Sequence, residues 1–340
     1  MNIETFIHNG VLRFAREPKD NPSNLNFPGY TVPLIEHDYP AKTPAMWNAA
    51  YREFGMEAGN VMLVGDPERI PEIFAAFRQD PKYLGGGAGV GFKDEAVKHL
   101  DGLDPLASEI GSVNLILKTS GGALKGFNTD GLGYAQSLEN VFKARGKILE
   151  GKKAVILGAG GTGNAVAFAL AGKGMQLVIL NRTVEKAEVL AGKLNDFFML
   201  KGKEWVRFGG EELIGAEVSD ADTVINVSTK GAAGDFERYS ALAPAKLPAA
   251  EENIRENLEQ AARVLAKVPK TAVVSDIVLG KEPTPFLKAA AQAGFETLDG
   301  VAMVINQGVE AFWLIHGKET RQKGFTKKHI REVMERAASA

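Results

Sequence analysis

Four glycines near the middle of the chain have the spacing that lets a protein backbone hold a phosphate. They follow an apolar run and open an alanine-rich stretch, and a second apolar run follows at residues 177–180. This order predicts a strand, a tight turn, a helix and a second strand, the unit in which a dinucleotide pyrophosphate lies at a helix N-terminus. Glycine permits the turn, the approach of N–H groups to phosphate and close helix–strand packing. The candidate cofactor-binding residues of this loop are Gly158, Ala159, Gly160, Gly161, Thr162 and Gly163.

The residues after the second apolar run favour NADP over NAD. Many NAD-binding units carry an acidic residue about 20 residues after the glycines, where it binds the ribose 2′-hydroxyl. This chain has Asn181, Arg182 and Thr183 at that place, followed by Lys186. No carboxylate there repels a 2′-phosphate, and a guanidinium, a hydroxyl and an ammonium are available to hold one. The alternatives are a purely structural turn and an ordinary polar loop.

The composition is typical of a metal-free globular protein with two domains. The 340 residues are 45% apolar and carry a formal net charge of −2, so nucleic acid and anionic membranes are not expected as main partners. Cysteine is absent, and the five histidines lack the spacing of metal ligands. The sequence has neither a signal-peptide pattern nor an apolar stretch of membrane-spanning length. We expect a cytoplasmic protein, either a monomer or a homodimer, whose partner is a small molecule.

The first part of the chain alternates apolar runs with amphipathic stretches. This alternation predicts an α/β domain with parallel strand–helix–strand packing. The expected extended segments are residues 30–35, 60–64 and 84–92, together with a hairpin over 113–127 that turns at 120–122. The expected helices are residues 44–54, 68–78 and 94–100. A further helix, residues 130–144, is expected to lead into the second domain.

The second part of the chain predicts a Rossmann-type, doubly wound parallel sheet. Its apolar runs are residues 154–157, 177–180, 223–226, 272–274 and 296–298. A charged amphipathic helix is expected at 251–267, either as a solvated surface helix or as a dimer contact or lid. Two tail helices are expected at 301–315 and 326–338, the latter with Thr326 as its N-cap. The predicted domains are residues 1–130 with 305–340, which bind substrate and carry the catalytic groups, and residues 131–304, which bind NADP.

Two charged residues adjoin unusual segments. Lys93 follows the glycine-rich run 85–92, whose backbone suits the close approach of a ligand. Taken alone, Lys93 would be a solvated surface lysine. Asp130 ends the run Gly-Phe-Asn-Thr-Asp and begins the linking helix, where by itself it would be an N-cap carboxylate.

Several motifs together resemble the shikimate/quinate dehydrogenase family. The first is Gly-Phe-Asn-Thr-Asp-Gly-Leu-Gly at 126–133, placed after Ile-Gly-Ser-Val-Asn at 110–114. The second is Asp-Gly-Val-Ala-Met-Val-Ile-Asn-Gln-Gly at 299–308, followed by Ala-Phe at 311–312. The glycine loop with its Asn-Arg-Thr and the segment Asn-Val-Ser-Thr-Lys-Gly at 226–231 are also similar. The resemblance runs in order from about residue 30 to 318.

The resemblance implies a two-domain oxidoreductase that reversibly reduces a ring ketone of a polyhydroxylated cyclic acid with NADPH, without a metal. Its catalytic lysine and aspartate fall on Lys93 and Asp130. An ammonium beside a carbonyl can stabilise the alkoxide that hydride transfer creates and supply its proton. The positions that bind ring hydroxyls fall on Asn114 and Gln307. The resemblance also adds Ser228 and Met303 to the candidate cofactor-binding residues.

The departures from the family pattern concern substrate recognition. The family's Ser-x-Ser-Pro is Ala-Lys-Thr-Pro here, so Thr43 is the remaining candidate for the substrate carboxylate, and Lys42 either supplies a charge or is a surface lysine. Its Asn-Val-Thr is Gly-Ala-Gly at 87–89, and its usual tyrosine is Leu279. A site that loses several donors should bind its old ligand poorly, which favours quinate, another ring polyol or a bulkier acid. A non-catalytic sensor of NADP and a ring ligand, and a folate-linked dehydrogenase, are the remaining alternatives.

Overall fold

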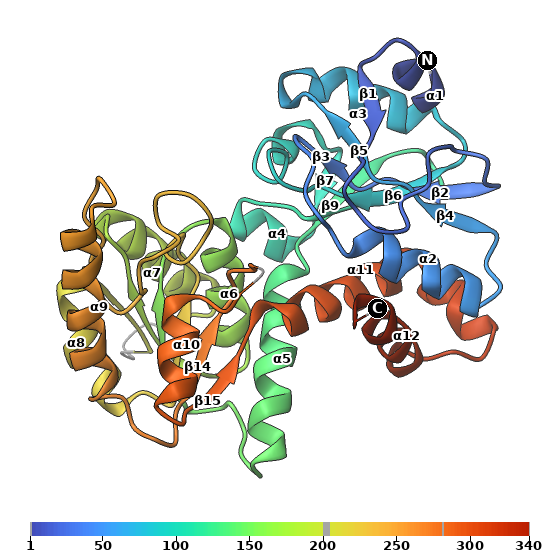
Figure 1. The fold of residues 1–340 in the computed structure, drawn as a ribbon. Coiled ribbons are helices and arrows are strands. Elements are labelled where there is room, and N and C mark those ends of the chain that lie inside the picture. Colours follow the sequence, from blue (N-terminus) through green and yellow to red (C-terminus); the bar gives the residue numbers. More distant parts are fainter. Residues whose placement is uncertain (1, 200–204, 281, 340) are drawn as a thin grey trace. The chain divides into compact units, whose positions relative to one another are not determined.

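The chain folds into two compact units. The computed structural model describes residues 2–199, 205–280 and 282–339 (Figure 1). Unit 1 comprises residues 1–129 and 305–340, and unit 2 comprises residues 130–304. The chain passes from one unit to the other between Thr129 and Asp130, and again inside helix α11 (Gly300–Gln322). The assignment of substrate to unit 1 and of NADP to unit 2 stays a prediction.

Unit 2 contains a six-stranded sheet in which every strand pair is parallel. Its order is β12-β11-β10-β13-β14-β15, which in chain order reads 3-2-1-4-5-6, the order of dinucleotide-binding sheets. The strands are β10 (Lys153–Leu157), β11 (Gln176–Leu180), β12 (Val206–Gly209), β13 (Thr223–Asn226), β14 (Val273–Asp276) and β15 (Glu296–Leu298). The predicted fold class, including the Rossmann-type sheet, is confirmed. The edge strand β12 was not predicted.

Helices cover both faces of this sheet because its central strands are apolar on both sides. One core joins strand residues such as Val155 and Val224 to the apolar sides of α8 (Ile214–Glu217), α9 (Glu251–Leu265) and α10 (Pro285–Gln292). Figure 1 shows α10 lying over β14 and β15. The other helices of the unit are α5 (Asp130–Ala144), α6 (Gly161–Gly172) and α7 (Val184–Phe197). Helix α9 buries one side and exposes its glutamates, as expected for a surface helix.

Unit 1 contains a mixed sheet of order β4-β2-β6-β8-β9-β7 and a three-stranded sheet of order β1-β5-β3. The strands are β1 (Leu12–Phe14), β2 (Gly29–Thr31), β3 (Leu34–Ile35), β4 (Ala58–Asn60), β5 (Leu63–Gly65), β6 (Tyr83–Gly87), β7 (Gly102–Leu103), β8 (Leu115–Lys118) and β9 (Leu124–Phe127). The predicted hairpin is confirmed as β8 and β9. The prediction of parallel packing is wrong at this place, because β8 is antiparallel to both β6 and β9.

Two expected strands are each divided between the two sheets. Residues 30–35 form β2 in one sheet and β3 in the other, and Pro33, which has no N–H group to donate, lies between them. Residues 60–64 are divided in the same way between β4 and β5. The two segments change sheet side by side, with the N–H of Val61 bonded to Thr31 O and that of Leu63 to Pro33 O, each at 2.9 Å. The expected helix at 94–100 is also wrong: only a 3₁₀ turn, Ala96–His99, forms there.

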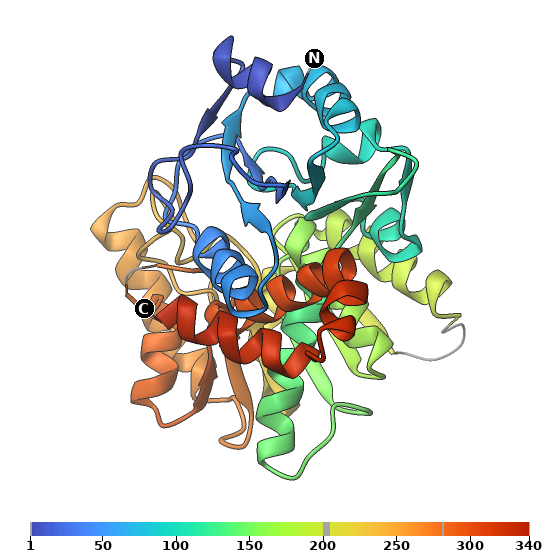
Figure 2. The same cartoon turned by 90° about the vertical axis from the view of Figure 1, so that its right-hand side faces the viewer.

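The helices of unit 1 are α1 (Ile3–His8), α2 (Thr43–Glu53), α3 (Ile70–Gln79), α4 (Pro105–Ile110), the second part of α11, and α12 (Lys327–Ser339). Figure 2 shows α12 packed beside α2, although the two helices are far apart in the sequence. Thr326 caps α12 as predicted, since its Oγ1 accepts the N–H of His329 at 3.4 Å. Helix α11 is longer than the predicted 301–315.

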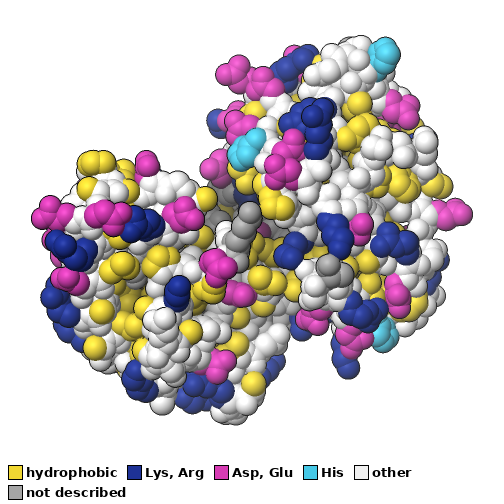
Figure 3. Space-filling model, in the orientation of Figure 1, with side chains coloured by type: hydrophobic (Ala, Val, Ile, Leu, Met, Phe, Trp, Pro, Cys, Tyr) yellow, Lys and Arg dark blue, Asp and Glu magenta, His cyan; other side chains and the backbone are white. Residues whose placement is uncertain are grey.

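The surface of the molecule carries both signs of charge. On the face shown in Figure 3, lysine and arginine side chains alternate with aspartate and glutamate. Within the described ranges, no helix combines the length and apolarity needed to cross a bilayer. In the same ranges, no three acidic or histidine side chains are grouped so that they could hold a metal ion.

Candidate functional site

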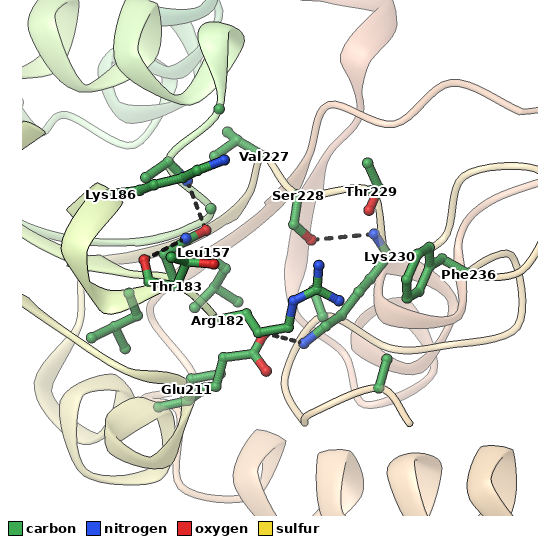
Figure 4. Close-up of a pocket in the computed structure, with 18 residues that line it drawn as sticks. Leu157, Arg182, Thr183, Lys186, Glu211, Val227, Ser228, Thr229, Lys230 and Phe236 are labelled. Atoms are coloured by element: carbon green, nitrogen blue, oxygen red, sulfur yellow. Dashed lines mark hydrogen bonds and ion pairs between the residues drawn. The ribbon is translucent and has the colours of Figure 1, made fainter. Parts of the chain in front are cut away.

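A groove lies at the carboxyl ends of β10, β11 and β13 in unit 2. Its cavity volume is about 220 Å³. It is lined by the glycine loop, the residues after β11, the residues after β13 and part of the segment 236–245 (Figure 4). In an open parallel sheet this is the point at which the strand order reverses, and ligands bind there because the adjoining connections leave to opposite faces.

The geometry of the glycine loop explains two of its glycines. Gly158 has φ +124°, a conformation that disfavours other residues, and its N–H donates to Leu180 O at 2.8 Å. A Cβ at Gly163 would lie 2.9 Å from the carbonyl oxygen of Gly158, so helix α6 could not pack as closely. Gly160, the N-cap of α6, provides no side-chain cap, and a Cβ there would meet no atom within 4 Å. The first turn of α6 therefore presents its N–H groups without a side-chain acceptor.

The residues after β11 divide into one that holds the loop and two that present charge. Asn181 Oδ1 accepts the N–H of Ala159 at 3.1 Å, and its Nδ2 donates to Thr183 O at 2.8 Å, so this amide ties the glycine loop to the end of β11. Arg182 and Lys186 are exposed and line the groove. Neither of them forms an ion pair with any described residue. The groove therefore presents two positive charges to an anion.

A buried polar network holds the segment after β13. Ser228 Oγ donates to Asn226 Oδ1 at 2.7 Å, and Asn226 Nδ2 donates to both carboxylate oxygens of Asp276 at 3.0 Å. Thr284 Oγ1 donates to Asp276 Oδ2 at 2.7 Å. Burial raises the pKa of Asp276 to about 6, although the hydrogen bonds from Asn226 and Thr284 oppose that shift. Sequence reasoning missed Asp276. Its position at the end of β14, the strand next to β13, was the available signal.

A charged pair that sequence reasoning also missed forms one side of the groove. Lys230 Nζ donates to Glu211 Oε1 at 2.7 Å and to Ala243 O at 2.6 Å. The side chains of Lys230 and Glu211 are 8% and 16% exposed. Desolvation lowers the pKa of Lys230, the Glu211 carboxylate raises it, and the nearby Arg182 guanidinium lowers it. Figure 4 shows these three side chains gathered in the groove.

A second polar cluster lies in unit 1. Asn114 Nδ2 donates to Thr129 Oγ1 at 3.0 Å and to Gln307 Oε1 at 3.3 Å, while Asn114 Oδ1 accepts the N–H of Thr129 at 2.8 Å. The structure thus brings together two predicted substrate-binding residues and adds Thr129, which the Asn-Thr-Asp motif contained. Thr43 is the first residue of α2 and has no hydrogen bond to this cluster among the described residues.

The two predicted catalytic residues lie in different units. Lys93 follows β6 in unit 1, where its carbonyl oxygen accepts the N–H of Val113 at 3.0 Å. Asp130 is the first residue of α5 in unit 2. Their convergence on a substrate stays a prediction. Met303 lies on α11 in unit 2 and is not among the residues that line the groove.

One expectation about the substrate side needs correction. A Cβ would lie 2.5 Å from Ile116 O at Gly85 and 2.0 Å from Val32 O at Gly86. These glycines therefore serve the close approach of the protein's own strands, and a ligand is not needed to explain them. Lys42 is an exposed surface lysine, as one of the two alternatives predicted, and its Nζ donates to Ala338 O at 2.7 Å. This contact places a cation at the C-terminal turn of α12, where it is favourable.

Comparison with known proteins agrees with this architecture. The family model described as the shikimate dehydrogenase substrate-binding domain matches residues 39–116, and the one described as shikimate/quinate 5-dehydrogenase matches residues 140–202. A shikimate dehydrogenase (NADP(+)) of Methanosarcina acetivorans is 32% identical over 318 residues, which cover 86% of this chain and 94% of the relative.

Two solved structures extend the comparison. A shikimate dehydrogenase in complex with NADP+ is 28% identical, covers 93% of this chain and 98% of its own, and has a TM-score of 0.71. A 5-ketofructose reductase of Gluconobacter sp. strain CHM43, in ligand-free form, is 26% identical, covers 91% and 98%, and has a TM-score of 0.67.

The Rossmann-type sheet with a basic groove at its switch point, together with these relatives, identifies a nucleotide-dependent oxidoreductase that acts on CH–OH groups. The chain belongs to the shikimate dehydrogenase family, and the predicted resemblance is confirmed.

Proposed function

We propose that unit 2 binds NADP(H) in its groove and that the enzyme reversibly interconverts a ring ketone and its alcohol in a polyhydroxylated cyclic acid of the shikimate type. The observation that carries the cofactor assignment is that Arg182 and Lys186, two exposed cations with no ion pair to a described residue, lie beside a glycine loop at the switch point. The relatives named as NADP(+)-dependent shikimate dehydrogenases support both the cofactor and the substrate class.

The residues of the groove fit a 2′-phosphorylated dinucleotide. The N–H groups of the first turn of α6, together with the loop backbone, hold the pyrophosphate, and Arg182, Thr183 and Lys186 hold the 2′-phosphate. Ser228, kept in place by Asn226 and Asp276, borders the same groove. When bound, the cofactor supplies a hydride in reduction and accepts one in oxidation.

In the proposed reaction, Lys93 moves the proton. Its ammonium stabilises the negative charge that develops on the carbonyl oxygen and gives that oxygen its proton during reduction. In oxidation the neutral amine takes the proton back from the hydroxyl. Asp130 accepts a hydrogen bond from the Lys93 side chain and so orients its nitrogen toward the reacting oxygen.

The amide cluster of unit 1 supplies recognition of the ring hydroxyls. The amides of Asn114 and Gln307 can each donate and accept, and Thr129 fixes the orientation of Asn114 through two hydrogen bonds. A site that presents buried amides discriminates steeply against a substrate without the matching hydroxyl, because the amide is then left unpaired.

One observation favours a second candidate, a ring or chain polyol ketone that lacks a carboxylate. Ala41 and Thr43 stand where the family pattern has serines, and Lys42, the cation between them, is engaged with Ala338 O at 2.7 Å. The carboxylate clamp is therefore smaller than the pattern implies. The relative named 5-ketofructose reductase is consistent with a substrate of this kind.

The test is a substrate panel for the wild type and two variants. Shikimate, quinate and cyclic polyols are offered with NADP+ and with NAD+, and reduced nicotinamide is measured. Lys93→Ala should lower kcat about 10²–10⁴-fold while NADPH binding is unchanged. The control is Lys98→Ala, which removes an exposed lysine of the same unit that pairs with Glu95. Full activity of Lys93→Ala would contradict its role. NADPH binding without turnover of any substrate would favour the sensor.

A further inference from the structure

An acidic residue lies in the proposed nucleotide groove, although the sequence has none at the end of β11. Glu211 follows β12 and lines the same groove as Arg182 and Lys186. In NAD-binding sheets the carboxylate that binds the ribose 2′-hydroxyl follows the second strand, which is β11 here, and Glu211 reaches the same groove from the next strand along the chain. A bare Glu211 carboxylate would therefore oppose NADP in two ways, because it would repel the phosphate and would attract the Arg182 guanidinium.

Lys230 masks this carboxylate. Its ammonium donates to Glu211 Oε1 at 2.7 Å, and the pair is almost fully withdrawn from solvent. Screening by water and salt is weak at such a place, so the neutralisation is more effective than in an exposed pair. The backbone of Lys230 is also held in place. Its carbonyl oxygen accepts a hydrogen bond from Asn226 Nδ2 at 2.9 Å, and its N–H donates to Ser228 Oγ at 3.2 Å.

The second acceptor of the ammonium is held independently. Ala243 O accepts Lys230 Nζ at 2.6 Å and also accepts Asn257 Nδ2 from helix α9 at 3.0 Å. Asn257 Oδ1 accepts the N–H of Ser240 at 2.8 Å, so one buried amide fixes the segment that carries Ala243. Phe236 of this segment also lines the groove (Figure 4). Lys230 is therefore held in place before any ligand binds, and it links the connection after β12 to the connection after β13.

The charged side chains that line the groove have a positive formal sum. Among its described lining residues the charged side chains are Arg182, Lys186, Lys230 and Glu211, three cations and one anion, so the formal sum is +2. Without Lys230 the sum falls to +1. The remaining carboxylate then shares the groove with Arg182, whose side chain lies with Glu211 and Lys230 in Figure 4. The 2′-phosphate is then either repelled by the Glu211 carboxylate or deprived of the Arg182 guanidinium, which pairs with that carboxylate instead.

We infer that Lys230 is a specificity-determining residue of the cofactor site, which gives the groove its preference for a 2′-phosphorylated nucleotide by neutralising Glu211. This inference rests on the proposed function of the groove. It differs from a direct phosphate contact, because the ammonium acts on the phosphate through the acid that it covers.

The experiment compares NADPH and NADH dissociation constants for Lys230→Met, Glu211→Gln and the double variant, at low salt. The ratio of the two constants is the readout, because a loss of folded protein cancels in it. Lys230→Met should lower the preference for NADPH at least about tenfold, mainly by weakening NADPH. Glu211→Gln should keep or raise the preference. The double variant should return to within about threefold of the wild type, since the acid that Lys230 covers is gone.

Lys153→Met is the matched control. Lys153 pairs with Glu217 in the same unit, with side chains 12% and 17% exposed, but it begins β10, at the amino end of the sheet. Its loss should lower stability and leave the cofactor ratio unchanged. The masking role is overturned if Lys230→Met leaves the ratio of the NADPH and NADH dissociation constants unchanged. It is also overturned if the double variant prefers NADPH no more than Lys230→Met does. Either result leaves the proposed function intact. A wild type that does not bind NADPH overturns the proposed function itself.

Discussion

Acid should destabilise unit 1 through a single buried histidine. His316 on α11 is 7% exposed, and its Nε2 is 2.8 Å from the hydroxyl of Tyr51. That hydroxyl is also 3.1 Å from Thr31 Oγ1 of β2. Burial lowers the pKa of His316 to about 4, because the imidazolium would lose its hydration among aromatic rings such as Phe312.

The sign and size of the effect follow from proton linkage. A histidine with a pKa of about 4 in the folded state and about 6.5 in the unfolded state binds its proton first in the unfolded chain. Its contribution to stability is thus present above pH 6.5 and is lost as the pH falls toward 4. The free energy of unfolding should fall by about 2 kcal/mol between pH 7 and pH 5, and by about 3 kcal/mol in all.

The assay is urea unfolding followed by tryptophan fluorescence, because Trp47 lies beside His316 with a ring-centroid distance of 6.2 Å. His316→Gln removes the titration and keeps a group that can hydrogen-bond to Tyr51. Between pH 7 and pH 5, its free energy of unfolding should fall by about 2 kcal/mol less than that of the wild type. His37→Gln, at a side chain that is 64% exposed, should keep the wild-type dependence. Equal pH dependence in wild type and His316→Gln would refute the reasoning.

Two further substitutions test the cofactor groove and the packing of unit 2. Arg182→Asp should shift preference from NADP toward NAD, since it replaces a cation of the 2′-phosphate site with an anion. Unchanged dissociation constants for NADPH and NADH would contradict the assignment of Arg182 to that site. Gly131→Ala would place a Cβ 2.0 Å from Ala165 O, so α5 and α6 must separate, at a cost of about 1–3 kcal/mol in unfolding free energy. Gly192→Ala in α7 meets no atom within 4 Å and should be neutral or stabilising. Equal thermal midpoints for these two alanine variants would contradict the packing argument.

Local patterns predicted most of unit 2 because its signals are local. The glycine loop and the five predicted strands lie in short segments. Strands β10, β11, β13 and β14 are buried almost throughout, so most of their sequence is apolar. Strand β12 was not predicted because it is not a continuous apolar run: Arg207 and Phe208 are exposed, while Val206 and Gly209 are buried. Glu211 follows this strand, so without β12 the sequence did not indicate that Glu211 lines the groove.

Unit 1 was predicted less well because its signals depend on partners distant in the chain. The run 30–35 is apolar except for Thr31, and only the pairing with β4 and β6 on one side and β5 on the other shows that it serves two sheets. The glycines at 85 and 86 suggested a ligand for the same reason, since the atoms that exclude a Cβ belong to Val32 and Ile116. The amide cluster of Asn114 and Gln307 was found only through the family resemblance.

Cofactor preference in this sheet is a property of several strand ends together. Parallel strands bring their carboxyl ends to one edge, so Arg182 after β11, Glu211 after β12 and Lys230 after β13 share one groove although they are distant in the sequence. The residue after the second strand reveals only the guanidinium of Arg182. It does not reveal the Glu211 carboxylate or the Lys230 ammonium that neutralises it. Because a 2′-phosphate experiences the sum of these charges at short range, an acid in the groove is compatible with NADP only while a buried cation remains beside it.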